Sequence, residues 1–222
     1  MKPRLALFDL DHTLLLGDSD VLWCDFLIAE GLLDRAAFAV RNADMESRYQ
    51  AGTVGVDEFA GFYVSTLAGR SPLEWEPLRR RFLHEQVVPR IPPGALDLVR
   101  QERAAGALVV LTTATNRYIT ELTAAHLGID HLLATEAQQQ DGLFTGGVYG
   151  PPNMRAGKVR RLQDWLAQRG SSLAGWHSIA YSDSSNDLPL LEAADEAVAV
   201  EPDPQLAAIA RQRAWRVIRW NG

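Results

Sequence analysis

The sequence has little cysteine and no long apolar run. Cys24 is the sole cysteine among 222 residues, so an intrachain disulfide is excluded. No segment approaches the roughly 18 uninterrupted apolar residues of a membrane-spanning helix, and the N-terminus enters a short apolar stretch without the apolar core of a signal peptide. We therefore expect a soluble, cytoplasmic protein without a membrane partner. Cys24 stands between Trp23 and Phe26 in an apolar stretch, where we expect it to pack.

An excess of positive charge is also absent. The formal net charge is -6, whereas nucleic acids are bound by concentrated Lys and Arg, so nucleic acid is not an expected partner. The run Arg79-Arg80-Arg81 is interpreted as a solvent-exposed helix face. Hydrophobic residues make up 47% and charged residues 23% of the chain, which is ordinary globular composition. The length suits one catalytic core that carries a smaller inserted module.

Four short apolar segments each run into polar residues, as buried parallel strands do. They are residues 5–8, 107–112, 178–181 and 197–200. Helix-like stretches alternate with them, which predicts an α/β fold with a Rossmann-like, doubly wound parallel sheet and helices on both faces. Residues 132–136 and 142–148 flank Asp141-Gly142 and predict a small hairpin at the sheet edge.

A long interval without a convincing strand separates the first two apolar segments. Its helical signals are the apolar pairs at 21–22, 26–27 and 32–33 and the aromatic residues Phe59, Phe62 and Tyr63. We expect an all-helical cap domain over residues 16–88, inserted into a core formed by residues 1–15 and 89–222. The aromatic residues of the insert are expected to form a small core of its own.

Carboxylates follow two of the predicted strands. Asp9 and Asp11 come directly after residues 5–8, and Asp183 and Asp187 come after residues 178–181. Open α/β sheets bind their ligands at the carboxyl ends of the strands. Buried charges are costly, so a purely structural role would require each acid to cap a helix or to form a salt bridge. Since Mg2+ takes one or two protein carboxylates together with water and phosphate, these residues predict a magnesium site.

Groups suited to an oxyanion follow a third strand. Residues 112–115, Thr-Thr-Ala-Thr, offer hydroxyl and backbone N–H donors, and Lys158 after Gly157 offers a positive charge. Each of these signals is weak alone, because Thr and Lys are common surface residues. Their order along the chain carries more information than any single one.

Taken together, these segments resemble the four motifs of the haloacid dehalogenase superfamily of phosphohydrolases, which span the chain outside the insert. Residues 8–14, Phe-Asp-Leu-Asp-His-Thr-Leu, are similar to the first motif. Thr113 corresponds to the second, Lys158 to the third and residues 183–187 to the fourth. Thr112 is the alternative for the second motif, and Thr113 is preferred because four or five strand residues precede it.

The resemblance implies a reaction and a set of ligands. Asp9 would attack phosphorus to form an aspartyl-phosphate, while Asp11 would protonate the leaving oxygen and then activate water. Mg2+ would be held by Asp9, the Asp11 backbone carbonyl and Asp183. The residues that complete this set are Asn186 and Asp187, which would orient the metal ligands, and Thr113, Ala114 and Lys158, which would bind phosphoryl oxygens.

The insert resembles the helical cap of the branch that contains the phosphoserine phosphatases. In that branch a cap Glu binds the substrate ammonium and a cap Arg binds the substrate carboxylate. Here Asp18 stands at the position of the Glu, with Asp20 close by, and Tyr63 stands at the position of the Arg. An acidic partner without a basic one favours a cationic substrate that lacks a carboxylate, because a buried unpaired carboxylate is penalised. Histidinol phosphate is such a small phosphorylated metabolite.

Several alternatives stay open at this point. The substrate could be phosphoserine or another small phosphomonoester, including a lipid head-group phosphate. The chain could instead be an inactive domain that keeps the fold and binds phosphate or a partner. Asp18 could simply cap the first cap helix.

Overall fold

One seven-stranded sheet forms the centre of the computed structural model, which describes residues 2–50 and 55–220. Its strand order is β4-β3-β2-β1-β5-β6-β7, and only β3 and β4 pair antiparallel. The strands are β1 (Arg4–Phe8), β2 (Leu108–Asn116), β3 (His131–Gln140), β4 (Leu143–Tyr149), β5 (His177–Ser182), β6 (Glu196–Val200) and β7 (Arg216–Ile218). The four predicted parallel strands and the edge hairpin are confirmed. The edge strand β7 was not predicted, since its three residues are largely exposed and form no apolar run.

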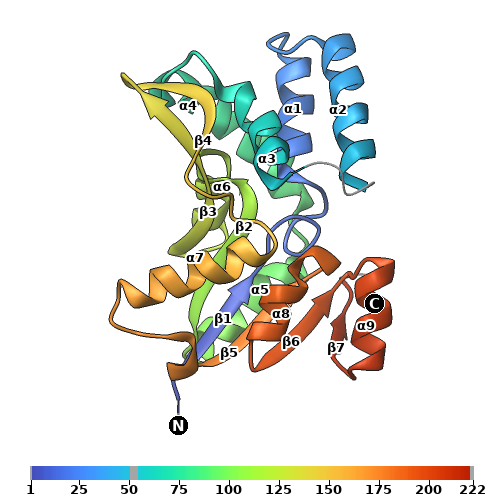
Figure 1. Cartoon of the computed structure of the whole chain (residues 1–222), viewed down its shortest axis with the longest axis vertical. Helices are drawn as coiled ribbons and strands as arrows, with labels where there is room; N and C mark the ends of the chain where they lie inside the picture. The colour runs from blue at the N-terminus through green and yellow to red at the C-terminus, as the bar shows by residue number, and fades with distance from the viewer. Residues whose placement is uncertain (1, 51–54, 221–222) are drawn as a thin grey trace.

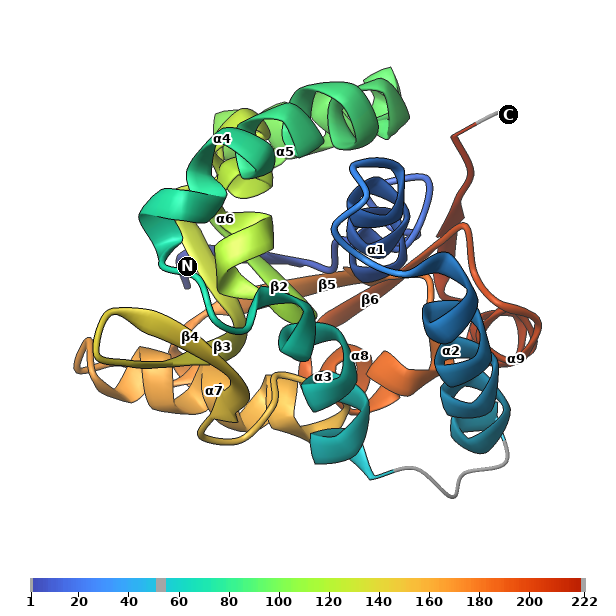
Figure 2. The same cartoon turned by 90° about the horizontal axis from the view of Figure 1, so that it is seen from above.

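Helices cover both faces of this sheet. The longer helices are α1 (Ser19–Ala29), α2 (Arg35–Gln50), α3 (Val56–Val64), α4 (Pro72–Phe82), α5 (Pro93–Ala104), α6 (Arg117–His126), α7 (Ala156–Ala167), α8 (Leu188–Ala193) and α9 (Pro204–Gln212). Short 3-10 or π turns are η1 (Ser65–Leu67), η2 (Leu83–Val87), η3 (Val88–Arg90), η4 (Leu173–Gly175) and η5 (Ser185–Asp187). Seen from above, α5 lies on one side of the sheet and α7 and α8 lie on the other (Figure 2). The doubly wound α/β prediction is confirmed.

Alternation along the strands builds two cores. In β1, Ala6 and Phe8 pack into one apolar cluster while Leu5 and Leu7 pack into a second on the opposite face. Successive strand residues point to opposite faces of a sheet, so a continuous apolar run is required when both faces are covered. This is why residues 5–8 carry four apolar side chains in a row and are all fully buried.

The interval between β1 and β2 contains helices and turns throughout its described residues, as expected for a helical cap (Figure 1). Trp23 of α1 meets Trp75 of α4 and Phe82 at ring-centroid distances of 5.5 and 5.1 Å, within the same cluster as Phe8. The pair at 32–33 lies beyond the end of α1, in the turn that follows. The boundaries proposed at residues 15/16 and 88/89 stay a prediction.

A smaller cluster joins α1, α2 and α3. It consists of Cys24, Phe38, Met45, Phe62 and Tyr63, with Phe59 packed against it. The predicted separate core of the insert is therefore confirmed, and so is the packing role of Cys24, whose thiol pKa is raised by burial.

One prediction about the surface is wrong. Arg79 is buried rather than exposed: its guanidinium lies 4.4 Å from the Tyr118 ring centroid and forms ion pairs with Glu76 and Glu121. Its neighbours Arg80 and Arg81 do lie at the surface. Helical periodicity explains the difference, because residues adjacent in sequence point about 100° apart around a helix.

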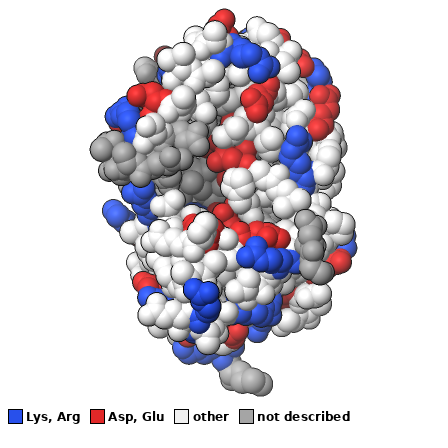
Figure 3. All heavy atoms as spheres, turned by 90° about the vertical axis from the view of Figure 1, so that its right-hand side faces the viewer, with Lys and Arg blue, Asp and Glu red and all other residues white. Residues whose placement is uncertain are grey.

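The hairpin of β3 and β4 reaches from the core to the cap. The Gly69 amide donates to the Phe144 carbonyl at 2.9 Å, and the Phe144 amide donates to the Arg70 carbonyl at the same distance. On the face shown in Figure 3, basic and acidic side chains are interspersed. No helix among residues 2–50 and 55–220 is long and apolar enough to cross a membrane.

Candidate active site

Asp9 occupies the position directly after β1, at the carboxyl edge of the sheet. Its side chain is only 6% exposed, and its Oδ1 accepts a hydrogen bond from Lys158 Nζ at 2.6 Å. The same ammonium donates to Asp187 Oδ2 at 2.6 Å, and the Ser182 hydroxyl donates to that oxygen as well. Burial alone would lower the pKa of Lys158, but Asp187 and Asp9 raise it above its ordinary value. Lys158 is therefore a permanent cation between two carboxylates.

Asp183 faces Asp9 across the hydroxyl of Thr13. Thr13 Oγ1 lies 2.9 Å from Asp183 Oδ1 and 3.4 Å from Asp9 Oδ2, and it accepts a hydrogen bond from the Asp183 amide. Burial raises the pKa of Asp183 to about 8, and the charge of Asp9 adds to the rise. Burial likewise raises the pKa of Asp9 to about 7, although Lys158 opposes it. Asp9 and Asp183 thus share a buried site in which the charge of Lys158 does not keep both carboxylates at their ordinary pKa.

Asp11 is held by donors from two other segments. Its Oδ1 accepts a hydrogen bond from the Ser19 amide at 2.7 Å, and its Oδ2 lies 3.2 Å from the Thr113 hydroxyl and 3.0 Å from the Thr115 hydroxyl. Burial raises the pKa of Asp11, and the charge of Asp18 raises it further. The second acid of the first motif is consequently fixed in orientation before any ligand binds.

A local irregularity in β2 presents these threonines. Thr112 pairs with Leu133 and Asn116 pairs with Thr135, so four steps along β2 match only two along β3. Extra residues in one strand form a β-bulge, which protrudes from the ladder and changes the direction of their side chains. The expected strand end at residue 112 was therefore too early, and Ala114 lies half-buried in the protruding turn.

Asn153 holds this protrusion and was missed by the sequence analysis. It is fully buried, and its Nδ2 lies 2.9 to 3.0 Å from the Thr112 hydroxyl and the carbonyls of Thr113 and Leu133. Thr112 is thus engaged by Asn153, whereas Thr113 points to Asp11. A lone Asn in a segment with two prolines gives no signal of such a role.

The two acidic residues of the cap differ in their surroundings. Asp18 is the N-cap of α1, and its Oδ1 accepts hydrogen bonds from the amides of Asp20 and Val21. Asp20 is 8% exposed; its Oδ2 lies 3.2 Å from the Thr115 hydroxyl, and its Oδ1 has no hydrogen-bond partner in the described structure. Burial raises the pKa of Asp20 well above its usual range, and Asp18 and Asp11 add to this.

Two more of the predicted residues lie in the small cap cluster and in η5. Tyr63 belongs to the small cap cluster, and its hydroxyl donates to Asn42 Oδ1. Asn186 lies in η5, where its amide donates to the Ser184 hydroxyl. Their proposed contributions to substrate and metal binding stay predictions.

The donor set fits a hard divalent cation. Asp9 and Asp183 converge on Thr13, and their pKa values are raised first by burial and then by the charges of neighbouring carboxylates, so a bound cation would stabilise their ionised forms. In the part of the chain that the structure describes, no three His, Cys, Asp or Glu side chains converge as a complete metal cage. Mg2+ does not require one, because it commonly binds one or two carboxylates and keeps water and phosphate as further ligands.

Comparison with known proteins identifies the family. The family described as haloacid dehalogenase-like hydrolase matches residues 6–192. The chain belongs to this family. A histidinol-phosphatase of Neisseria meningitidis is 37% identical over 220 residues, covering 98% of this chain and 99% of that protein. A phosphoserine phosphatase of Mycobacterium tuberculosis is 32% identical over 220 residues, covering 96% and 69%.

Because the chain belongs to a hydrolase family and its relatives are named as phosphatases, it is a phosphatase. The alternative of an inactive binding domain is therefore wrong. Among solved structures, a Bordetella pertussis protein of unknown function is 43% identical with a TM-score of 0.94, covering 99% of this chain and 100% of that one. A phosphoserine phosphatase with an analogue of its phospho-aspartyl intermediate is 19% identical with a TM-score of 0.68, covering 98% and 93%. The latter shares the fold.

Proposed function

We propose that the chain is a Mg2+-dependent phosphomonoesterase that acts through an aspartyl-phosphate on Asp9. The observation that carries the proposal is the position of Asp9: a buried carboxylate at the end of β1, held by Lys158 and facing Asp183 across Thr13. A carboxylate that is fixed, desolvated and next to a cation is suited to nucleophilic attack on an anionic ester.

The two chemical steps use Asp9 and Asp11. An oxygen of Asp9 attacks phosphorus while the bond from phosphorus to the leaving oxygen breaks, and protonated Asp11 gives its proton to that oxygen. Ionised Asp11 then takes a proton from water, whose oxygen attacks phosphorus and releases phosphate and the Asp9 carboxylate. The raised pKa of Asp11 favours the protonated form that the first step needs.

Other residues of the site stabilise the charge on the phosphoryl group. Lys158, the Thr113 hydroxyl and the backbone amide of half-buried Ala114 would bind its oxygens, and as fixed dipoles and charges they require little reorganisation. Mg2+ held by Asp9, Asp183 and the Asp11 backbone carbonyl would reduce the repulsion between carboxylate and phosphate. Asn186 and Asp187 would orient these ligands.

For the substrate we infer a small phosphorylated amine, with histidinol phosphate the best candidate. Asp20 supports this, because its buried Oδ1 lacks a hydrogen-bond partner in the described structure and a substrate cation would satisfy it. Asp18 is occupied as a helix cap, so Asp20 is the better ligand of the two. The Neisseria meningitidis relative named histidinol-phosphatase, which matches over the full length, supports the same substrate. Cytoplasmic amino-acid biosynthesis is the corresponding setting.

Phosphoserine is the second candidate, because the Mycobacterium tuberculosis relative is named a phosphoserine phosphatase. Purified protein with Mg2+ should have a kcat/KM for histidinol phosphate at least about tenfold above that for O-phosphoserine, equivalent to about 1.4 kcal/mol. Equal turnover of the two would remove the basis for the amine proposal. The mechanism is tested separately by Asp9→Asn, which should abolish phosphate release from p-nitrophenyl phosphate; retained release refutes the role of Asp9.

The cap assignment is tested by a matched pair of variants. Asp20→Asn should raise KM for histidinol phosphate and leave turnover of p-nitrophenyl phosphate, which carries no amine, within about threefold, a change of ~0.6 kcal/mol. Asp18→Asn is the control, because Asn is as good an N-cap as Asp, and the lost Asp18 charge, which raises the pKa of Asp11, should affect both substrates equally. A selective loss in Asp18→Asn instead of Asp20→Asn would reverse the assignment.

A further inference from the structure

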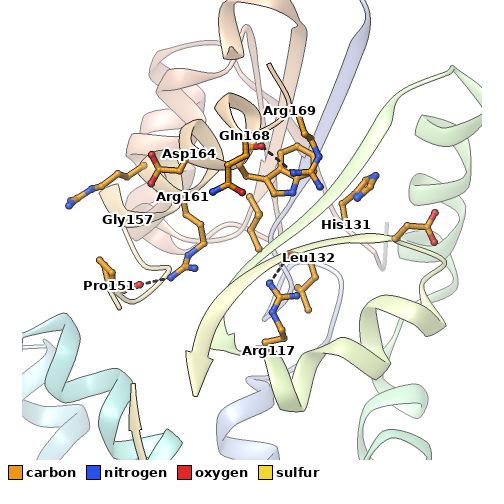
Figure 4. Close-up of a pocket in the computed structure, with 13 residues that line it drawn as sticks. Arg117, His131, Leu132, Pro151, Gly157, Arg161, Asp164, Gln168 and Arg169 are labelled. Carbon is orange, nitrogen blue, oxygen red and sulfur yellow. Dashed lines mark hydrogen bonds between the residues drawn. The ribbon is translucent and has the colours of Figure 1, made fainter. Parts of the chain in front are cut away.

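A cavity of about 470 Å³ lies away from the catalytic residues, between α7 and the start of β3. Its volume falls within the usual range of about 300 to 1,000 Å³ for small-molecule sites. Of the α7 residues that line it, Gly157, Arg161, Asp164 and Trp165 recur at helical spacing and form one face of the helix, and Arg160 lies beside this face. Figure 4 shows Arg161 reaching from α7 into the same space as Arg117.

The charge of this cavity is opposite to that of the whole protein. Four arginines line it, Arg117, Arg160, Arg161 and Arg169, against two aspartates, Asp130 and Asp164. The chain as a whole carries a formal net charge of -6. Asp130 also forms an ion pair, at 3.7 Å, with Arg103, which does not line the cavity. The local excess of positive charge therefore attracts anions to this point of the surface.

Most of these guanidinium groups have no carboxylate partner. Arg117 pairs with Glu136 at 2.8 Å, but within the described structure Arg160, Arg161 and Arg169 form no salt bridge. Arg161 is half-buried and donates through one nitrogen to the Pro151 carbonyl at 2.5 Å. Burial lowers the pKa of Arg161; the charges of Glu136 and Asp164 raise it in part, and the charge of Arg117 lowers it further. A half-buried guanidinium of this kind is stabilised by an anion, which it can bind through two nitrogens.

An aromatic surface completes the lining. The Trp165 ring has Arg169 stacked 3.9 Å from its centroid on one side and the His131 ring at its edge, 5.4 Å away. Arg169 also donates to the Trp165 carbonyl, which holds the pair together. An aromatic side chain can contact a ring, and arginines can bind an anionic group.

From these observations we propose that the cavity is a second, non-catalytic binding site for a small phosphate ester that carries a ring. Arg161 binds the phosphate group, Arg160 adds positive charge at the exposed rim of the cavity, and Trp165 contacts the ring. The site is separate from the catalytic one, because Lys158 of the same helix points to Asp9 whereas Arg161 and Trp165 line the cavity. The proposal does not depend on the substrate of the catalytic site.

Phenylphosphonate is a suitable probe, because it combines a ring with a dianionic group. It has a carbon–phosphorus bond in place of the ester bond, so a phosphomonoesterase does not hydrolyse it. We expect calorimetric titration of the Mg2+-loaded protein to show at least one binding site for phenylphosphonate. Arg160→Glu should lower the affinity of this site by about tenfold or more, since the substitution changes the charge at the cavity rim by two units. Arg160 is exposed and forms no salt bridge in the described residues, so the variant should fold. Benzoate, with the same ring and a single charge, should bind more weakly.

Arg211→Glu is the matched control. Arg211 is exposed in the last turn of α9, and its substitution changes the net charge equally without altering the cavity lining. Both variants should keep kcat and KM for p-nitrophenyl phosphate within about twofold, a change of ~0.4 kcal/mol. Three results each overturn the proposal: no binding of phenylphosphonate, sites that all keep their affinity in Arg160→Glu, or an equal loss in Arg211→Glu.

Discussion

Asn153 provides the sharpest test of how the site is held together. Its amide nitrogen has two hydrogens and three acceptors within 3.0 Å: the Thr112 hydroxyl and the carbonyls of Thr113 and Leu133. Asn153→Ala removes both donors and leaves buried acceptors without partners. Each such loss costs about 1 to 3 kcal/mol, so two predict a decrease of about 2 to 6 kcal/mol in the free energy of unfolding.

The same substitution should also impair catalysis. Asn153 fixes the carbonyl of Thr113, whose hydroxyl faces Asp11, and a displacement of about 1 Å in an active site can reduce the rate about a hundredfold. We expect kcat/KM for p-nitrophenyl phosphate to fall by about ten- to a hundredfold. Asn153→Asp should be more harmful still, because a carboxylate would face the carbonyl oxygens of Thr113 and Leu133.

Urea denaturation followed by circular dichroism measures the stability, and steady-state kinetics in Mg2+ measures the activity. Gln101→Ala, at an exposed position of α5, is the control and should change stability by no more than about 0.5 kcal/mol. A loss below about 1 kcal/mol in Asn153→Ala, with unchanged kcat/KM, would refute this account of the β2 protrusion.

Four further results are expected. Lys158→Met should lower kcat/KM for p-nitrophenyl phosphate by about 10²- to 10³-fold, and a change below tenfold would contradict its role. EDTA should abolish turnover and added Mg2+ should restore it, whereas full activity in EDTA would exclude the proposed metal. Burial alone raises the pKa of Glu102, but hydrogen bonds from Arg4 and Tyr181 lower it below its ordinary value. Ionised Glu102 therefore stabilises the folded protein fully above about pH 4.3, and this contribution is lost as the pH falls through the pKa of Glu102 in the folded state. The stability difference between wild type and Glu102→Gln in urea should therefore narrow below about pH 4, and a constant difference would be inconsistent with this linkage. Asp18→Ala should cost about 1 kcal/mol through loss of the α1 N-cap, measured by the same urea titration, and a neutral effect would show that the cap is dispensable.

The fold was predictable where local pattern and burial coincide. Strands buried on both faces need uninterrupted apolar residues, and β1, β2, β5 and β6 each have them. The edge strand β7 lacks such a run because its residues stay largely exposed, and it is held by pairing with β6 instead. Arg79 was misread for a related reason, since the exposure of one residue in a charged run depends on which side of α4 faces α6.

The site was predictable in its residue types and less so in its contacts. Asp9, Asp11 and Asp183 could be placed at one sheet edge because each follows a strand that ends there. Thr115 was among the predicted hydroxyl donors, but its contact with Asp11 could not be predicted, because it depends on the extra residues in β2. Asn153 could not be found, because its role depends on how its loop packs against β2. In the cap, sequence spacing ranked Asp18 first, whereas burial and hydrogen bonding favour Asp20.

The sequence by itself determined the class of chemistry, since acidic and hydroxyl residues at strand ends, together with Lys158, stand in the order typical of haloacid dehalogenase-like hydrolases. Tertiary structure alone decided that Thr113 and Thr115 both face Asp11, that Oδ1 of Asp20 has no hydrogen-bond partner in the described structure, and that α7 lines an arginine-rich cavity as well as supplying Lys158. The physical reason is that hydrogen bonds and burial join residues far apart in the chain, such as Thr13 with Asp183 and Asp9 with Lys158, and no local pattern encodes them.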